Sequence, residues 1–165
     1  MRKVIRDGQV VEDNWQYIED GVDVPADGDV LVSLARWQED ADALSARTGQ
    51  TGVFTNGAVD FDALVAVSSI VDAIALTFDK FADGRSYSHA HLLRTRHGYK
   101  KDLRATGDVL RDQVFYYNRV GFNVLEIRAD KDIEAAVESL KDFSVLYQPA
   151  ADGADPIYSK ERPDA

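Results

Sequence analysis

The sequence predicts an α/β protein with a mostly parallel sheet built from consecutive β-α units, preceded by an N-terminal β-hairpin. Three observations support this fold class. Short runs rich in Val, Ile and Leu alternate with segments whose apolar side chains recur at helical spacing. Residues 73–78 (AIALTF) form a continuous apolar run, typical of a strand buried on both faces. Asp7 and Gly8 separate two β-branched runs, as in a tight hairpin turn.

The first half of the chain supplies the hairpin and the first β-α units. Helices are recognised by apolar periodicity, by a capping residue such as Asp60, and by a glycine stop such as Gly49. Trp15 and Tyr17 are expected to cover the core. The expected elements are a hairpin over 3–12, a strand over 30–34, a helix over 34–44, a strand over 52–55, a helix after Asp60 and a strand over 73–78.

The second half continues the same alternation. Gly98 and Gly121 are expected to end two helices, because glycine adopts the backbone conformation of a helix C-cap at little cost. The expected elements are a helix starting at Ser86 or Ser88, a strand over 103–105, a helix capped by Thr106 or Asp108, a strand over 122–127, a helix over 131–142 and a last strand over 144–147.

Two architectures fit this order of elements: an open doubly wound sheet, or an incomplete barrel of β-α units. The spacing of the elements does not separate them. The length of 165 residues favours one domain, taken as residues 1–148. Residues 149–165 are rich in Pro, Asp and Ala, so we expect a flexible C-terminal tail there.

Composition excludes several classes of site. The chain has no cysteine, which rules out disulfides, thiol nucleophiles and iron–sulfur or haem groups held by thiolate. It has no apolar run of ~18 residues and no apolar leader at its start, so we expect a cytoplasmic protein without a membrane segment. The net charge of −10 argues against a nucleic-acid partner.

The charge reverses within the stretch that holds all three histidines. Residues 84–119 contain eight Lys and Arg and three Asp, a local charge of +5 in a chain of net charge −10. Such a reversal indicates a site for a negative ligand. A small anion, namely sulfite, sulfate or phosphate, is the expected class.

The predicted anion site lies at the edge of the sheet where the parallel strands end. Residues 79–87, 106–108 and 128–130 each follow a predicted strand, and ligands of such sheets bind beyond the carboxyl ends of the strands. Helix N-termini there direct N–H groups at the edge, and an arginine fork suits an oxyanion. The candidate residues are Asp83, Arg85, Tyr87, Ser88, Lys101, Arg104, Thr106 and Asp108.

Each of these residues also has a structural interpretation. Asp83 and Gly84 suit a turn, and Ser88 and Asp108 suit helix caps. Glu126 lies within an apolar strand, so it is either an edge residue or a buried acid paired with a cation such as Arg104.

Motifs of several enzyme and cofactor classes are absent. His89 and His91 are two residues apart and do not face each other on a helix, so no metal site is expected. The sequence has no GxGxxG, P-loop, GxSxG or HExxH motif. Classical dinucleotide binding and P-loop chemistry are therefore not expected, and the cofactor is unknown.

The motif-bearing stretch resembles a known family. The sequence of residues 81–122 resembles that of the bacterial domain-of-unknown-function 934 family, whose members are described as oxidoreductases associated with sulfite reduction. The resemblance is close over residues 73–126, although the loop before Asp83 lacks the Phe-Pro and Thr usual in the family. The matching motifs are Asp83-Gly84-Arg85, Tyr87-Ser88, Leu92-Leu93-Arg94, Gly98-Tyr99, Leu103-Arg104-Ala105, Gly107-Asp108-Val109-Leu110, Asp112-Gln113 and Gly121-Phe122.

The resemblance implies a place in assimilatory sulfite reduction and carries over no catalytic residue. Two functional classes stay open: an accessory protein of the sulfite reductase haemoprotein, or a small oxidoreductase with its own active site at the strand edge. Without cysteine, the chain cannot hold the cysteine-bound centre expected of the reductase itself. Arg111, Tyr116 and Arg119 are the candidate residues for docking that partner or a second copy of the chain, because Tyr and Arg are enriched at interfaces.

Overall fold

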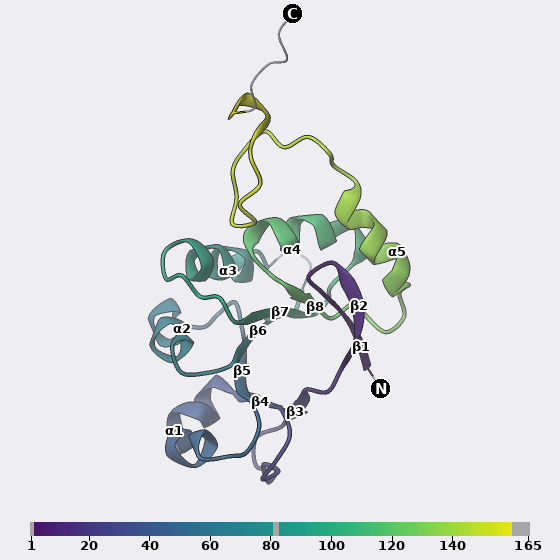
Figure 1. Ribbon diagram of the computed structural model, residues 1–165. Helices are drawn as coiled ribbons and strands as arrows, with labels where there is room; N and C mark the ends of the chain where they lie inside the picture. Colours follow the sequence, from purple (N-terminus) through teal and green to yellow (C-terminus); the bar gives the residue numbers. More distant parts are fainter. Residues whose placement is uncertain (1, 81–82, 160–165) are drawn as a thin grey trace, which may run out of the picture.

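Eight strands form one curled sheet in the order β2-β1-β8-β7-β6-β5-β4-β3, and helices cover its outer side (Figure 1). The computed structural model describes residues 2–80 and 83–159. Part of the predicted loop 79–87 and the last six residues of the predicted tail 149–165 therefore lie outside the described residues. The strands are β1 (Arg2–Arg6), β2 (Gln9–Asp13), β3 (Gln16–Ile18), β4 (Val30–Ser33), β5 (Thr51–Asn56), β6 (Ala73–Phe78), β7 (Asp102–Gly107) and β8 (Val124–Leu125).

Helices connect consecutive strands from β4 onward. The helices are α1 (Leu34–Ser45), α2 (Phe61–Ser68), α3 (Arg85–Thr95), α4 (Val114–Val120) and α5 (Ile133–Glu138), with 3-10 turns η1 (Arg111–Gln113), η2 (Ser139–Lys141) and η3 (Ile157–Ser159). The strands from β3 to β8 are parallel and each pairs with the next along the chain. This consecutive order keeps α1 to α4 on one side of the sheet, as Figure 1 shows. The sheet is therefore an incomplete barrel, and the doubly wound alternative is wrong.

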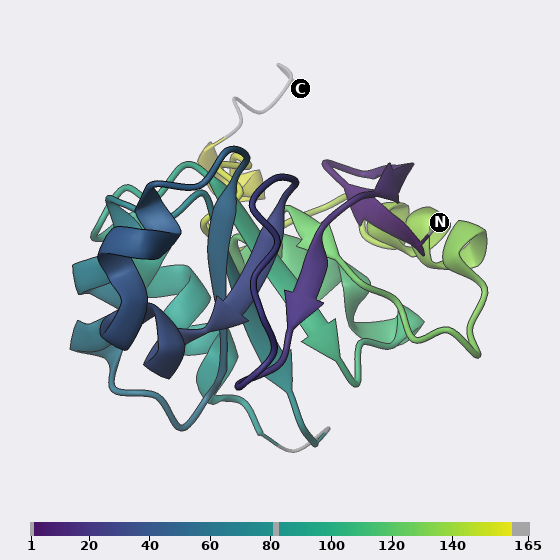
Figure 2. The same cartoon turned by 90° about the horizontal axis from the view of Figure 1, so that it is seen from below.

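The N-terminal hairpin extends this sheet rather than standing apart. Asp7 and Gly8 have positive φ angles of 49° and 80°, the conformation that a tight hairpin turn requires. Strand β1 pairs antiparallel with both β2 and β8. Helix α5 packs against β1 and β2, and Figure 2 shows it beside the hairpin, away from α1. Only Asn14 and Trp15 separate β2 from β3, so the chain crosses the open side of the curled sheet there.

The two faces of the sheet bury different side chains. On the outer face, Ile74 and Leu76 join the large core under the helices. On the inner face, Ala73 and Ala75 form a small cluster with Trp15 and Leu31, against which Tyr17 and Phe54 pack. The alternation along β6 places its larger side chains under the helices and its alanines on the inner face.

Several predicted boundaries are confirmed and two predicted helix starts are wrong. Asp60 caps α2, and Gly121, at φ 111°, ends α4. Helix α3 starts at Arg85 with Gly84 as its cap, so neither Ser86 nor Ser88 caps it. Helix α4 starts only at Val114, after η1.

The reason for the late start of α4 lies at the end of β7. Gly107, at φ 89°, turns the chain so that the Asp108 amide donates to the Phe78 carbonyl at 2.9 Å. Asp108 therefore stays bound to the sheet, and neither it nor Thr106 caps the helix. A side chain at position 107 would place its Cβ 2.6 Å from the Phe78 oxygen.

The C-terminal part differs most from the predictions. Strand β8 is only two residues long, and residues 144–147 are not a strand. These residues lie in a loop over α4, away from both edges of the sheet, so no strand is available to pair with them (Figure 1). Residues 149–159 continue this loop, with a hydrogen bond of 2.7 Å from the Ile157 amide to the Leu146 carbonyl.

Candidate functional site

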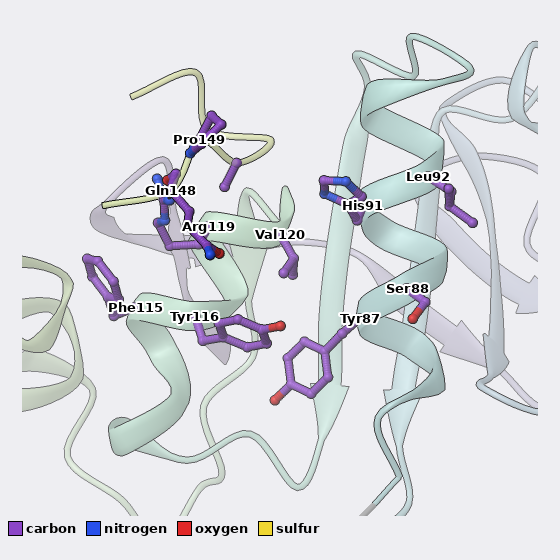
Figure 3. Close-up of a pocket in the computed structure, with 11 residues that line it drawn as sticks. Tyr87, Ser88, His91, Leu92, Phe115, Tyr116, Arg119, Val120, Gln148 and Pro149 are labelled. Atoms are coloured by element: carbon purple, nitrogen blue, oxygen red, sulfur yellow. Dashed lines mark hydrogen bonds between the residues drawn. The ribbon is translucent and has the colours of Figure 1, made fainter. Parts of the chain in front are cut away.

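A cavity of about 560 Å³ lies between α3, α4 and the C-terminal loop, and we call it the α3–α4 cavity (Figure 3). Figure 3 shows Tyr87 and His91 on α3 facing Tyr116 and Val120 on α4. The volume lies within the range of about 300–1,000 Å³ that is usual for small-molecule sites. The cavity is lined by Tyr87, Ser88, His91, Leu92, Phe115, Tyr116, Arg119, Val120, Gln148, Pro149 and Ala150.

Aromatic packing fixes the floor of this cavity. The Tyr87 ring lies 5.0 Å from both Tyr116 and Tyr117 and 4.9 Å from Phe78, measured between ring centroids. Tyr117 is fully buried. Burial raises the pKa of Tyr87 and of Tyr117 above the ordinary value for tyrosine, so both side chains stay neutral hydroxyls.

Large apolar side chains are exposed next to this cavity. Tyr147 is 73% exposed, and Phe143, Val145 and Tyr158 are each at least 60% exposed. Phe143, Val145 and Tyr147 line one shallow hollow with Phe115 and Arg119, and the Tyr147 ring lies 6.0 Å from Tyr158. We call this the aromatic surface; it consists of Tyr116, Phe143, Val145, Tyr147, Ile157 and Tyr158.

Arg119 holds the C-terminal loop against α4. Its Nη1 donates to both carboxylate oxygens of Asp152, at 2.7 and 2.8 Å, and its Nη2 donates to the Gln148 carbonyl. The Ala151 amide in turn donates to the Arg119 carbonyl at 3.0 Å. The sequence makes Arg119 a candidate docking residue. In the structure it is buried, and its guanidinium is bonded to Asp152 and Gln148.

A buried ionic cluster occupies the inner face of the sheet. Arg104 is 0% exposed, and its Nη2 donates to Asp13 Oδ2 at 2.7 Å and to Glu126 Oε1 at 2.8 Å. Arg2 also pairs with both carboxylates. The Tyr17 hydroxyl donates to Glu126 Oε1 at 2.5 Å and so ties β3 to the far side of the sheet. Of the two alternatives for Glu126, an edge residue or a buried acid paired with a cation such as Arg104, the structure shows the second.

The electrostatics of this inner cluster follow from burial and from balanced charge. Burial alone disfavours the charged guanidinium of Arg104, but the Glu126 and Asp13 carboxylates outweigh that effect and raise its pKa. Burial, and then the Glu126 carboxylate, raise the pKa of Tyr17. Two arginines facing two carboxylates give the cluster no net charge to attract an anion.

The structure separates the residues predicted to share an anion site. Tyr87 and Ser88 line the α3–α4 cavity on the outer side of the sheet. Thr106 lies on the inner side, where its hydroxyl is 3.3 Å from Glu126 Oε2, close to Arg104. Tyr87 and Ser88 therefore lie on the opposite face of the sheet from Thr106 and Arg104.

The remaining predicted residues form ion pairs of their own. Arg85 is exposed, and its Nη2 donates to Asp83 Oδ2 at 2.7 Å. Asp108 accepts from Arg128 at 2.9 Å, which confirms that residues 106–108 and 128–130 meet at one edge.

Lys101 lies at the other end of the sheet. It directly precedes β7, and its Nζ donates to the Val71 carbonyl at 2.8 Å. Arg85 is thus the predicted cation left exposed at the carboxyl edge, and its guanidinium already holds Asp83. Anion binding there stays a prediction.

Sequence reasoning missed several residues of these sites. Asp13 and Tyr17 contact Arg104 and Glu126 from sequence positions about ninety or more residues away, and no local pattern marks them. The exposed residues Ile157 and Tyr158 could have been found, because apolar side chains in a Pro- and Asp-rich segment are unusual.

Arg94, one of the motif residues, has a structural role. Arg94 donates to the carbonyls of Tyr99, Lys101 and Gly121 at 2.6–2.8 Å and to Asn123 Oδ1 at 2.9 Å. These bonds clamp α3 to the starts of β7 and β8. In residues 2–80 and 83–159, no three metal-ligating side chains gather, and no helix has the length and apolar character to cross a bilayer.

A family model described as "Bacterial protein of unknown function (DUF934)" matches residues 52–158. This match covers more than half of the chain, so the chain belongs to that family. It spans β5 to η3 and includes Arg104, Glu126, the α3–α4 cavity and the aromatic surface. No curated protein and no solved structure matches the chain.

Proposed function

We propose that this protein is an accessory protein that docks a partner of assimilatory sulfite reduction, the sulfite reductase haemoprotein, through its aromatic surface. One observation carries the binding role. Of the eight large apolar residues that are exposed in the described part of the chain, six belong to the aromatic surface. Phe143, Val145 and Tyr147 line one hollow, and contiguous apolar surface marks interaction sites in soluble proteins.

The arrangement of the aromatic surface supports a protein partner. Tyr and Phe supply large contact area at low cost in side-chain entropy, and they are enriched at the centres of interfaces. The adjacent α3–α4 cavity offers an apolar recess, with the His91 and Ser88 side chains at its wall, for an anchoring side chain of the partner. Because Arg119 fixes the loop that carries Tyr147 and Val145, much of the surface is ordered before binding.

The partner's identity comes from the family resemblance and not from the geometry. Members are described as associated with sulfite reduction, and this chain lacks the cysteines that would bind the reductase's own centre. A supporting protein of that enzyme is the role consistent with both facts.

The test is a binding titration with the purified haemoprotein. The paired substitution Val145→Ser and Tyr147→Ser should weaken binding at least ~10-fold, as expected for central contacts of an interface. The matched control replaces the two exposed apolar residues outside the surface, Val22→Ser and Ile70→Ser, and should bind as the parent does. Equal binding by the parent and the Val145/Tyr147 variant would remove the surface from the proposal.

A growth assay tests the pathway separately. A deletion strain should fail to grow on sulfate as sole sulfur source and should grow on sulfide. Normal growth on sulfate would contradict the pathway and leave the docking surface standing for another partner. Self-association, detected by light scattering and lost in the Val145/Tyr147 variant, would instead identify the occupant as a second copy of the chain.

A second candidate is a small oxidoreductase with its active site at the carboxyl edge of the strands. The observation that favours it is a cavity at that edge beside Thr77 and Asp79. A flavin or haem absorption spectrum of the purified protein would favour this class, and a colourless protein that binds the reductase would favour the accessory role.

A further inference from the structure

A second cavity, of about 370 Å³, opens at the carboxyl ends of β4, β5 and β6, and we call it the mouth cavity. It is separate from the α3–α4 cavity, with which it shares no lining residue. Ligands of β/α barrels bind at this end of the strands. The mouth cavity is lined by Ser33, Leu34, Ala35, Phe54, Thr55, Asn56, Thr77 and Asp79.

A row of hydrogen-bonding side chains runs from this cavity across the inner face. Asn56 pairs in register with Thr77, and Thr77 with Thr106. Thr106 Oγ1 lies 3.3 Å from Glu126 Oε2. Because side chains alternate along a strand, Asn56, Thr77 and Thr106 share the inner face with Phe54, Ala75 and Arg104 two residues earlier. Strands β5, β6 and β7, and Glu126 directly after β8, thus present an amide, two hydroxyls and a carboxylate side by side.

Part of this row is held in place and part is left for a ligand. Asn56 Oδ1 accepts from the Ala58 amide at 3.0 Å, and Asn56 Nδ2 donates one hydrogen to Asp79 Oδ2 at 3.0 Å. The second amide hydrogen of Asn56 and the other carboxylate oxygen of Asp79 make no hydrogen bond to a described residue. The Thr77 hydroxyl has no hydrogen bond to a described residue. The cavity therefore offers donors and acceptors together, which suits ligand hydroxyls because a hydroxyl both donates and accepts.

An aromatic ring forms the apolar side of the cavity. Phe54 lines it, and the Tyr17 ring supports Phe54 from behind with 5.6 Å between the ring centroids. Tyr17 is itself fixed by its hydrogen bond to Glu126. The inner cluster thus acts as the support of the Phe54 ring, against which the C–H face of a ring-shaped ligand can pack.

The charge of the lining argues against an anion here. Asp79 carries an exposed carboxylate, and the lining includes no Lys or Arg. We propose that the mouth cavity binds a small neutral polyhydroxylated molecule, of the size of a monosaccharide.

The test is saturation-transfer NMR with four probes, glucose, galactose, mannose and ribose, against the whole protein. At least one sugar should receive saturation, and Kd for that sugar should rise about tenfold when Asp79→Asn replaces the charged acceptor by a neutral amide or Thr77→Val removes the hydroxyl. Matched controls make the same chemical changes at exposed positions outside the cavity, Asp23→Asn and Thr48→Val, and should leave Kd unchanged.

The outcomes separate the alternatives. No transfer to any of the four sugars would overturn the proposal, as would transfer that the Asp79 and Thr77 variants leave unchanged. Chemical-shift changes at Thr77 on adding sulfate, without any on adding sugar, would assign the cavity to an anion and also overturn it. None of these results depends on the docking partner, so failure here is distinct from failure of the proposed function.

Discussion

Replacing Arg104 by Met tests whether the inner cluster joins the two ends of the curled sheet. In the parent, Asp13 Oδ2 and Glu126 Oε1 accept hydrogen bonds from the same Arg104 nitrogen, at 2.7 and 2.8 Å. The two oxygens therefore lie within 5.5 Å, the sum of those lengths. Without the guanidinium between them, two unit charges at that distance repel by about 3 kcal/mol at an effective dielectric constant of about 20. Arg2, which still pairs with both carboxylates, offsets part of this repulsion.

The expected loss of stability combines this repulsion with the lost hydrogen bonds. Breaking a buried ion pair by removing one partner costs about 3–5 kcal/mol, and in a protein of this size that lowers Tm by about 6–20 °C. Met keeps the length of the arginine stem, so the effect reports the charge rather than a cavity. Thermal unfolding followed by circular dichroism measures it, with Arg85→Met as the matched control at an exposed pair.

A triple variant completes the design. Arg104→Met combined with Asp13→Asn and Glu126→Gln removes the repulsion and should recover more than half of the lost Tm. If Arg104→Met lowers Tm no more than Arg85→Met does, the cluster does not stabilise the fold and this reasoning is refuted. If the triple variant is no more stable than Arg104→Met, repulsion is not the cause.

Three further predictions concern the outer side of the protein. Arg85→Ala should leave Tm within about 1 °C of the parent, since surface ion pairs contribute little; unfolding of the variant would give Arg85 a structural role. Arg119→Ala should release the C-terminal loop, seen as at least ~10-fold faster hydrogen exchange at the Ala151 amide; unchanged exchange would contradict the clamp. Burial lowers the pKa of His89, so the unfolded chain binds its proton at higher pH than the folded one, and stability should fall as pH drops through about 6.5. His89→Gln should flatten that slope in urea titrations, and an unchanged slope would assign it to other groups.

Local chemistry explains why most secondary structure could be predicted. The run at 73–78 is β6 to the residue, because five of its six residues are apolar and buried, on both faces of the sheet. Asp60 and Gly121 mark helix ends through their own side chain and backbone freedom, and these act whatever the rest of the fold does. The predicted start of α4 was wrong because a non-local contact decides it. The Asp108 amide donates to the carbonyl of Phe78, thirty residues earlier in the sequence.

The architecture could not be read from the same patterns. An incomplete barrel and a doubly wound sheet use identical strands and helices and differ only in which strands become neighbours. That choice depends on non-local pairings such as β1 with β8. Only two residues join β2, beside β1, to β3 at the opposite edge of the sheet. The chain therefore crosses the inner side there and brings Asp13 and Tyr17 to Arg104 and Glu126, which no window of sequence indicates.

The sequence predicted part of the candidate site. It indicates which residues lie at the carboxyl edge of the sheet, but not which face of the sheet each side chain is on. Glu126 stood out as a charge within an apolar strand, and of its two predicted alternatives the structure shows the buried acid paired with Arg104. Along β7, however, Leu103 and Ala105 point under the helices while Arg104 and Thr106 point inward. The motif Leu103-Arg104-Ala105 therefore serves two surfaces at once. A ligand at this edge contacts either the inner side chains or those of α3, because the two sets lie on opposite faces of the sheet. The mouth cavity and the aromatic surface are therefore two separate sites, and each needs its own test.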